Sequence, residues 1–184
     1  MKFLALKMSI LLKDEIHEFF KAKQIVIEPF NFDQLGPNSY DVKLGNTLKV
    51  YTEFPLDPKK ENKTENIIIP KEGLVLQPGK LYLGYTIEKI GSKYFIPMYE
   101  GRSSMARLGI ESHLSAGFGD IGFINQWTLE IVVVHPIIVY PEMKIGQIYF
   151  HKINPDVNQE ENQYKGKYSK QEGPTESKSH LDYN

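Results

Sequence analysis

The spacing of apolar and polar residues predicts a chain built mainly of short β-strands. Strand-like runs occupy residues 25–27, 67–69, 73–76, 81–86, 94–99, 126–134, 137–140 and 145–151. Residues 35–45 begin with turn formers and continue as an alternating strand, and Pro78-Gly79 and Pro141-Glu142 mark turns between later runs. Many short strands with few helices are typical of an all-β sandwich, roll or barrel-like domain.

One helix is predicted near the N-terminus, over residues 9–23, with Ser9 as its cap. Its apolar stripe consists of Ile10, Leu11, Ile16, Phe19 and Phe20. Residues 54–66 are polar and charged with two prolines, so we expect an exposed loop there. Residues 1–8 are interpreted as a short N-terminal extension, because a second methionine, Met8, could be the natural start.

The last part of the chain, residues 154–184, is rich in polar residues and has almost no aliphatic ones. Such a composition favours a solvated, disordered tail. The alternative is a lid that orders over a ligand, in which Tyr164, Lys167, Tyr168 and Gln171 would touch phosphate and a ring. We expect a single domain over residues 1–184 that ends in this lid or tail from about residue 155.

Composition narrows the classes of protein to consider. The 41% hydrophobic and 12% aromatic content fits a globular protein, and the net charge of −1 gives no basic field for nucleic acid. The absence of cysteine excludes disulfides and thiolate zinc sites and fits a cytoplasmic protein. No stretch reaches the ~18 uncharged apolar residues of a membrane span, and lysines interrupt the apolar start, so neither a membrane segment nor a signal peptide is expected.

Residues 101–109 concentrate hydrogen-bond donors between two glycines. Arg102 and Arg107 supply guanidiniums that bind phosphate in a bidentate manner, and Ser103 and Ser104 supply hydroxyls. The segment lacks the Gly-Lys-Ser/Thr ending of a P-loop. Two interpretations stay open, an anion site or a capped helical turn whose arginines face solvent.

Residues 115–123 alternate glycines with other residues, which allows a close approach of the backbone under a bound ring or around a sharp bend. Asp120 lies among these glycines. Its carboxylate could accept a hydrogen bond from a sugar hydroxyl. The alternative role, common for Asp between glycines, is an Asx turn.

Glu130 lies within a strongly apolar β-type run. A buried carboxylate is costly unless it is paired or functional, and burial would raise its pKa and suit it to proton transfer. Alternatively, Glu130 points to a wet face of the sheet together with Thr128, opposite Leu129 and Ile131.

Other catalytic motifs are missing. The five histidines form no His-Glu-x-x-His pair and no zinc-deaminase set, and no Gly-x-Ser-x-Gly elbow supports a serine nucleophile. His113 is near the candidate site in sequence, and a structural role is the interpretation we favour for it.

Taken in order, these segments resemble the dCTP deaminase family, within the deaminase and dUTPase superfamily. The resemblance rests on Gly36-Pro37-Asn38-Ser39-Tyr40-Asp41 with Leu44-Gly45, Glu100-Gly101-Arg102-Ser103-Ser104 with Ala106-Arg107-Leu108-Gly109, Ala116-Gly117-Phe118 with Asp120 and Gly122-Phe123, Thr128-Leu129-Glu130, and Lys167-Tyr168 with Gln171, Gly173-Pro174-Thr175 and Ser177. It implies a mainly β, distorted β-roll or β-clip of the dUTPase type, with a short N-terminal helix and a flexible C-terminal lid. It also implies a homotrimer whose pockets lie between subunits.

The resemblance further implies hydrolytic deamination of dCTP to dUTP and ammonia, a step of pyrimidine deoxynucleotide metabolism. Glu130 matches the glutamate that moves protons between water, ring N3 and the departing amine. Ser103 and Arg107 match residues beside the attacking water, and the backbone at Ala116 also orients that water. Because the cysteines of zinc deaminases are missing, this chemistry needs no zinc.

Binding roles follow from the same resemblance. The first group of implied substrate-binding residues is Arg102, Ser103, Ser104, Met105, Ala106 and Arg107, in which Arg102 and the two serines contact the phosphates. Asp120 is implied to hold the deoxyribose 3′-hydroxyl, and Thr128, Leu129 and Glu130 to contact the pyrimidine edge. The closing C-terminal segment contributes Tyr164, Lys167 and Gln171. No residue of the protein is expected to bind a metal, because Mg²⁺ is carried by the triphosphate. Neither nucleic acid nor membrane is an expected partner, and inhibition by dTTP stays open.

Two residues depart from the family pattern, Ile121 where proline is usual and Asn125 where glycine is usual.

Three other functions stay in view. A bifunctional enzyme would also cut the triphosphate and give dUMP and diphosphate. A dUTPase is disfavoured because the tail lacks an Arg-Gly-x-x-Gly-Phe-Gly type of motif. A non-catalytic nucleotide-binding protein could share the same fold.

Overall fold

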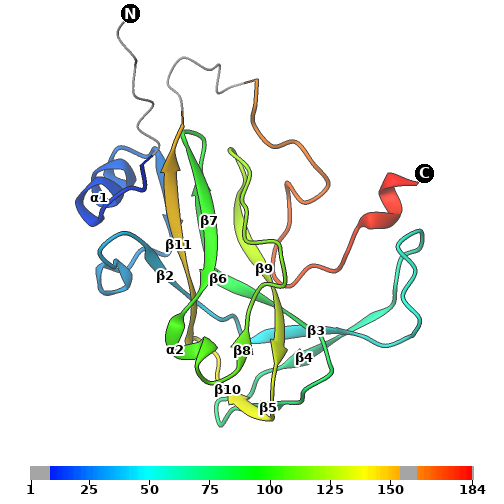
Figure 1. The fold of residues 1–184 in the computed structure, drawn as a ribbon. Helices are drawn as coiled ribbons and strands as arrows, with labels where there is room; N and C mark the ends of the chain where they lie inside the picture. The colour runs from blue at the N-terminus through cyan, green and yellow to red at the C-terminus, as the bar shows by residue number, and fades with distance from the viewer. Residues whose placement is uncertain (1–8, 154–160, 184) are drawn as a thin grey trace, which may run out of the picture.

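The computed structural model describes residues 9–153 and 161–183, so the expected extension at residues 1–8 lies outside it. Its elements are α1 (Lys13–Lys21), β1 (Ile25–Glu28), η1 (Phe32–Gln34), β2 (Tyr40–Lys43), β3 (Thr47–Tyr51), β4 (Thr64–Ile68), β5 (Leu74–Leu76), β6 (Tyr82–Ser92), β7 (Phe95–Gly101), α2 (Ser103–Ala106), β8 (Ile110–Glu111), β9 (Ile124–Val133), β10 (Ile137–Val139), β11 (Lys144–Lys152) and η2 (Ser179–Asp182). The predicted mainly β architecture is confirmed (Figure 1).

Within the described residues, the strands form three sheets. The largest has the order β4-β3-β6-β9-β8, with β1 also paired to β6. A second sheet has the order β2-β11-β7, and β10 pairs with β5. The first two sheets face each other across the core in Figure 1. The core is aliphatic and aromatic, and each fully buried side chain of this kind contributes about 1.5–3 kcal/mol relative to exposure.

The N-terminal helix is shorter than predicted, because α1 begins at Lys13 rather than at Ser9. The backbone N–H of Leu12 donates to the Glu15 carboxylate at 3.0 Å, which caps the helix. The preceding residues run in extended form along β11, where the N–H of Leu11 donates to the carbonyl of Phe150 at 3.0 Å. Leu11 and Ile16 are fully buried. The apolar pattern therefore identified core residues but extended the helix into a strand-like segment.

The predicted loop at residues 54–66 is also shorter than expected, because β4 begins at Thr64. Strand β3, over Thr47–Tyr51, was not predicted, and it pairs along its whole length with β4. β4 is the edge of the sheet, and Glu65 and Asn66 are exposed there. An edge strand tolerates polar residues on its open side, so its composition resembles that of a loop.

Strand β9 presents two distinct faces. Trp127, Leu129, Ile131 and Val133 are buried, while the intervening residues, including Thr128 and Glu130, are less buried. The predicted alternation along this strand is confirmed. It places Thr128 and Glu130 on one face of the sheet, away from the side chains of Leu129 and Ile131.

Opposite Trp127, strand β6 bulges. Its register with β9 shifts between Tyr85 and Lys89. The hydroxyl of Thr86, which is fully buried, accepts a hydrogen bond from the backbone N–H of Trp127 at 2.8 Å and donates to the carbonyl of Glu88 at 2.8 Å. A side chain thus replaces the ladder hydrogen bond that the bulge removes.

Replacing Thr86 with valine should lower the free energy of unfolding by about 1–3 kcal/mol, because it keeps the shape but leaves the N–H of Trp127 and the carbonyl of Glu88 unpaired in the core. Urea denaturation measures this difference. Thr52→Val is the matched control, since the hydroxyl of Thr52 is exposed and makes one long contact of 3.4 Å. Equal unfolding free energies for the two variants would contradict the role of Thr86.

The tail does not extend away from the domain over residues 161–183. It crosses β9 and ends in η2 beside the β3–β4 hairpin (Figure 1), where the hydroxyl of Ser179 donates to the carbonyl of Pro58 at 2.8 Å. Gln171 is only 7% exposed. The interpretation as a solvated tail is therefore wrong for these residues. Among the described residues, no helix has the length and apolar character needed to span a membrane.

Candidate active site

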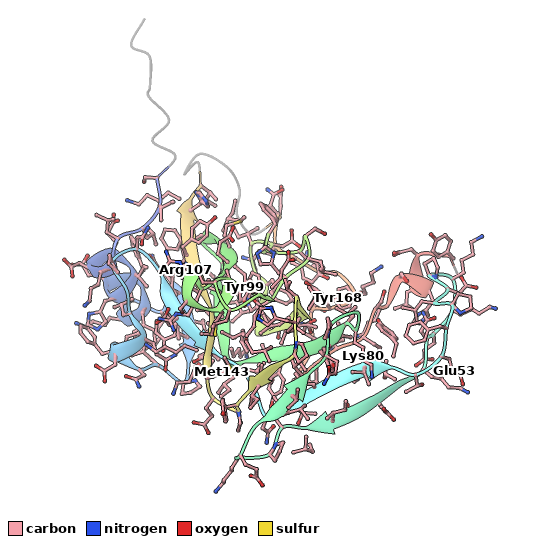
Figure 2. The ribbon with its side chains drawn as sticks, turned by 60° about the horizontal axis from the view of Figure 1, so that its bottom comes forward. Glu53, Lys80, Tyr99, Arg107, Met143 and Tyr168 are labelled. Carbon is pink, nitrogen blue, oxygen red and sulfur yellow. The ribbon has the colours of Figure 1, made fainter. Side chains whose placement is uncertain are left out.

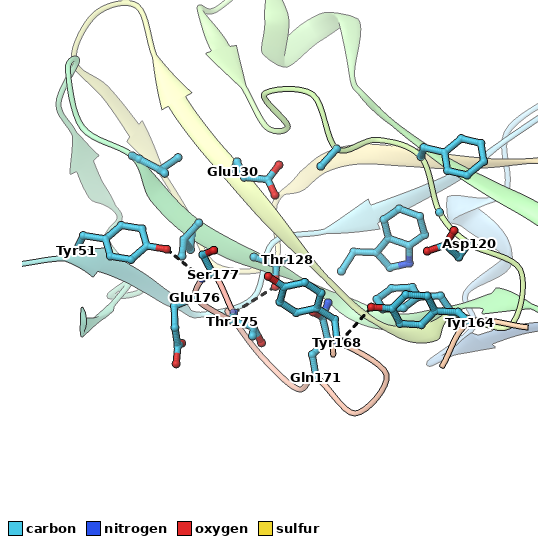
Figure 3. A pocket seen from close by; sticks show the side chains of 17 residues that line it. Tyr51, Asp120, Thr128, Glu130, Tyr164, Tyr168, Gln171, Thr175, Glu176 and Ser177 are labelled. Carbon is cyan, nitrogen blue, oxygen red and sulfur yellow. Dashed lines mark hydrogen bonds between the residues drawn. The ribbon is translucent and has the colours of Figure 1, made fainter. Parts of the chain in front are cut away.

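A pocket of about 430 Å³ lies between strand β9, the loop before it and the tail (Figure 3). Its strand residues include Leu83, Thr128 and Glu130, and its loop residues include Ala116 and Asp120. The tail contributes Tyr164, Tyr168, Gln171, Thr175, Glu176 and Ser177. Figure 3 shows Asp120 and Tyr164 at one end of the pocket and Tyr51 at the other, with Thr128 and Glu130 between them.

Glu130 is held in the pocket by the pairing of β9 with β6, where its backbone lies opposite Leu83. Its Oε2 atom is buried and has no hydrogen-bond partner among the described residues. Burial raises the pKa of Glu130, whereas backbone N–H groups, including that of Leu114, and the charge of His113 act in the opposite direction. A carboxyl group in this state is suited to accept and return a proton.

Because burial raises the pKa of Glu130 above its value in the unfolded chain, ionised Glu130 destabilises the fold. The favourable contribution of the protonated Glu130 side chain to stability is complete below the pKa of glutamate in the unfolded chain, about 4.3. It is lost as the pH rises through the pKa of Glu130 in the folded protein. Glu130→Gln should therefore have a higher Tm than the wild type at neutral pH, and the difference should shrink towards pH 4. Thermal unfolding between pH 4 and neutral pH tests the sign of this Tm difference. Glu72→Gln, on an exposed turn, is the control. A lower Tm for Glu130→Gln at neutral pH would contradict it.

The loop that carries Ala116 is anchored to β7. The N–H of Tyr99 donates to the carbonyl of Gly117 at 2.7 Å, and the N–H of Gly119 donates to the carbonyl of Pro97 at 2.9 Å. A Cβ atom at Gly119 would lie 2.3 Å from the ring of Trp127, so only glycine fits there. The ring that the backbone approaches at Gly119 is Trp127 of the protein itself, and the approach to a bound ring stays a prediction.

His113 lies next to the same loop. Its Nε2 atom is 3.5 Å from a carboxylate oxygen of Glu100, and its Nδ1 atom is buried without a hydrogen-bond partner in the described part of the chain. Its ring packs edge-on against Tyr99, whose hydroxyl donates to Ser112 at 2.7 Å. Burial raises the pKa of Tyr99, so its hydroxyl stays protonated as a donor.

One end of the pocket is aromatic. The rings of Phe123 and Trp127 meet edge to face with centroids 5.6 Å apart, as do those of Phe123 and Tyr164. The indole N–H of Trp127 donates to the carbonyl of Ile90 at 3.0 Å, which fixes the ring. Such a surface suits a flat or apolar part of a ligand.

The tail closes the opposite side of the pocket. The N–H of Thr175 donates to the hydroxyl of Thr128 at 3.2 Å, and the N–H of Ser177 donates to the hydroxyl of Tyr51 at 3.0 Å. Glu176 forms an ion pair with Lys49 of β3. The part of the chain that was interpreted as a solvated tail or a lid therefore forms a wall of the pocket.

The structure does not bring all predicted site residues together. Ala116, Asp120, Thr128, Glu130, Tyr164 and Gln171 line the pocket, whereas Arg102, Ser103, Ser104, Met105, Ala106, Arg107, Leu129 and Lys167 do not. Lys167 pairs with Asp182 of the tail, and the side chain of Leu129 lies in the core. Figure 2 shows Arg107 and Tyr168 well apart, with Tyr99 between them in that view.

Residues 102–107 instead surround the short helix α2 on the surface. Ser103, Ser104 and Arg107 are exposed. The guanidinium of Arg102 lies 3.2 Å from the carboxylate of Asp41, which also pairs with Lys144 at 3.0 Å. Within one chain, this cluster of donors faces solvent rather than Glu130, so the interpretation as a helical turn is right about its local shape.

Several pocket residues received no predicted role from the sequence. Tyr51 ends a strand that was not predicted, and Phe123 and Trp127 belong to ordinary apolar positions. Glu176 was hidden in the polar tail. Their role depends on contacts between distant segments. Among the described residues, no group of three or more His, Asp or Glu side chains is arranged to hold a metal ion.

Comparison with known proteins identifies the family of this chain. The family model described as dCTP deaminase-like matches residues 10–153. The chain belongs to the dCTP deaminase-like family. A protein of Clostridium acetobutylicum named "dCTP deaminase, dUMP-forming" is 51% identical over 161 residues, covering 88% of this chain and 91% of that protein. Another of the same name, from Hathewaya histolytica, is 54% identical over 151 residues, covering 82% and 86%.

The fold of the dCTP deaminase-like family is also found among solved structures. The crystal structure of 2′-deoxycytidine 5′-triphosphate deaminase from Agrobacterium tumefaciens matches with a TM-score of 0.63 and 22% identity. The match covers 84% of this chain but only 51% of that one, so the chain spans about half of its length. This likeness confirms the predicted fold class.

Proposed function

We propose that this protein converts dCTP and two waters into dUMP, diphosphate and ammonia. Glu130 carries the proposal, because its side chain lines a pocket with an aromatic end and one of its carboxylate oxygens is buried without a hydrogen-bond partner among the described residues. The dUMP product is supported by the relatives named "dCTP deaminase, dUMP-forming". dUTP, the product first expected, then becomes an intermediate.

Deamination proceeds by addition of water to C4 of cytosine and loss of the 4-amino group. Glu130 takes a proton from the attacking water as the C4–O bond forms and delivers a proton to ring N3. It then shuttles a proton to the amine as the C4–N bond breaks, so that ammonia leaves and uracil is formed. The raised pKa of Glu130, caused by burial, suits both directions of transfer. The backbone at Ala116, in the pocket wall, helps to orient the water.

The remaining donors come from a second subunit of a homotrimer. Ser103 and Arg107 are exposed and lie outside the pocket of their own chain, so they are available to a neighbour. In this arrangement they hold the water and stabilise the charge that develops at C4, while Arg102 and Ser104 contact phosphate. A heterologous contact repeated three times forms a closed ring, which gives each pocket the same composition.

The rest of the nucleotide lies along the pocket. Asp120 accepts from the 3′-hydroxyl of deoxyribose, and Tyr164 and Gln171 of the tail cover base and sugar. The substrate enters as the Mg²⁺ complex of its triphosphate, and Lys167 meets the phosphates after leaving Asp182. The second water adds to the α-phosphorus, and the bond from that phosphorus to the diphosphate oxygen breaks.

The experiment is to incubate the purified protein with dCTP and Mg²⁺ and to quantify nucleotides, diphosphate and ammonia. The expected result is equal amounts of dUMP, diphosphate and ammonia with little free dUTP. Accumulation of dUTP without diphosphate would limit the protein to deamination. Turnover of dUTP but not of dCTP would make it a dUTPase, and tight binding of dCTP without ammonia release would make it a non-catalytic binding protein.

A further inference from the structure

A row of three side chains crosses the main sheet at the pocket. Lys49 of β3 lies opposite Leu83 of β6, and Leu83 lies opposite Glu130 of β9. We propose that Leu83 is a positioning residue that separates the ammonium of Lys49 from the carboxyl group of Glu130 and so leaves that carboxyl group free to exchange protons. The consequence for catalysis rests on the proposed function, whereas the separation of the two charged groups does not.

All three side chains project from the same face of the sheet, because residues directly opposite each other in antiparallel strands share a face. Leu83 and Glu130 both line the pocket. So does Tyr51, which comes two residues after Lys49 on β3 and therefore shares its face, whereas Leu48 is fully buried on the core side. Neighbouring strands are about 4.8 Å apart, so the backbones of Lys49 and Glu130 are about 10 Å apart with Leu83 between them.

Leu83 is buried without being part of the hydrophobic core. Its side chain is 5% exposed, and it lies outside the main cluster of buried apolar residues, to which its neighbour Tyr82 belongs. The next residue, Gly84, also faces that core, because a Cβ atom there would lie 2.8 Å from the side chain of Ile131. Leu83 therefore forms part of the pocket wall beside Glu130.

The carboxyl group of Glu130 would be a favourable partner for a cation. Its Oε2 atom is buried and has no hydrogen-bond partner in the described part of the chain. An ammonium that reached this atom would gain a charge-assisted hydrogen bond, and an opposite charge within about 4–6 Å lowers the pKa of a carboxyl group. Glu130 would then be a weaker base towards water, and less of it would be protonated and able to return a proton.

Lys49 is instead paired with Glu176. Figure 3 shows the carboxylate of Glu176 pointing away from Glu130. A lysine side chain is a flexible stem of four carbons, so its ammonium can take more than one direction. To turn towards Glu130, the ammonium of Lys49 would have to cross the apolar side chain of Leu83 and lose its hydration there, which is costly for a charge.

Other titratable groups surround Glu130, and they stay the same when Leu83 is replaced. The charge of His113 lowers the pKa of Glu130. The strands packed around Glu130 carry Tyr85, Tyr99, Glu100 and Glu111. The pocket itself is lined by Tyr51, Asp120, Tyr164, Tyr168 and Glu176. A change in the pKa of Glu130 is therefore assigned to Lys49 only when removal of Lys49 reverses it.

NMR titration of protein labelled with ¹³C in the glutamate carboxyl groups tests the separation directly, with the signal of Glu130 identified by its absence from Glu130→Gln. Leu83→Ala should lower the pKa of Glu130 by about 1 pH unit or more, because Lys49 can then approach the carboxylate. Leu83→Met keeps an apolar side chain of similar size and should titrate like the wild type. Leu35→Ala is the matched control, since Leu35 is 6% exposed and does not line the pocket.

Removal of the ammonium distinguishes the approach of Lys49 from the entry of water. In the double variant Leu83→Ala/Lys49→Met, the pKa of Glu130 should return towards the wild-type value. An unchanged pKa in Leu83→Ala, or a pKa equally low in the double variant, would overturn the proposal. If Leu83→Ala does not fold, Leu83→Val makes the same comparison with a smaller opening, with and without Lys49→Met.

The pH dependence of kcat/KM for ammonia release from dCTP then tests the consequence for catalysis. Its acid limb should move to lower pH in Leu83→Ala and return in the double variant, because kcat/KM reports the pKa values of the free enzyme. A lowered pKa of Glu130 without a shift of this limb would overturn the positioning role. A wild-type protein that releases no ammonia would contradict the proposed function, and the NMR titration would still decide whether Leu83 separates the two charges.

Discussion

Glu130→Gln is expected to lose ammonia release from dCTP by a factor of about 10²–10⁴ or more while binding dCTP with nearly unchanged affinity. Glutamine keeps the size of the side chain but cannot take up and return a proton at neutral pH. The pocket wall formed by Phe123, Trp127 and the tail does not depend on that proton. Binding and chemistry should therefore separate in this variant.

Stopped-time assays of ammonia with dCTP, combined with calorimetry or fluorescence titration of a nucleotide, measure both properties of Glu130→Gln. Glu111→Gln, an exposed position on β8, is the control for an unrelated loss of charge. Near-normal ammonia release by Glu130→Gln would remove the carboxylate from the mechanism. Loss of dCTP binding together with activity would assign Glu130 to binding instead.

The same variant separates a functional carboxylate from a structural one. Glu88 is fully buried, and its carboxylate accepts hydrogen bonds from the side chain of Gln34 at 2.6 Å and from the N–H of Lys43 at 2.9 Å. Glu130 has a buried oxygen without a partner among the described residues. Burial of a polar atom without a hydrogen-bond partner destabilises the folded protein. Such atoms are found most often at functional sites. A higher Tm of Glu130→Gln at neutral pH, together with lost activity, would fit this trade-off.

Sequence patterns predicted the parts of the fold that depend on local periodicity. The alternation in β9 placed Thr128 and Glu130 on one face, and the structure confirms it. The errors arose where tertiary contacts override local signals: residues 9–12 pair with β11 instead of joining α1, and the polar strand β4 pairs at an edge. The tail was hardest to predict, since its order comes from contacts with distant β3 and β9 rather than from its composition.

The candidate site could be predicted only in part for a similar reason. Glu130 and Asp120 were found because a carboxylate in an apolar run or among glycines is unusual. Trp127 and Tyr51 look like ordinary strand residues, and only the pairing of strands places them in the pocket. In the structure of one chain, residues 102–107 lie outside the pocket that contains Glu130. The order of the motifs along the sequence does not show which of them share a pocket within one chain.

That separation leads to the second large effect, complementation between subunits. If Arg107 completes the pocket of a neighbouring subunit, as proposed, Glu130→Gln and Arg107→Ala should each be nearly inactive alone, the latter by about 10²–10³-fold, because each would remove one half of every pocket. Arg107 is exposed and lies outside the pocket of its own chain. When the two variants are mixed one to one in the same trimers, some pockets combine an intact Glu130 from one subunit with an intact Arg107 from its neighbour.

In a closed ring of three, every mixed trimer has one pocket in three that contains both intact residues, so ammonia release by the purified mixed trimers should recover to about a third of the wild-type rate. Co-expression with two different tags, followed by tandem purification, yields the mixed oligomers for the assay. A mixture of Glu130→Gln with the double variant Glu130→Gln/Arg107→Ala is the control and should stay inactive. Absence of recovery in verified mixed trimers would place both residues in the pocket of one chain, and it would require the exposed segment around α2 to move towards Glu130 within that chain.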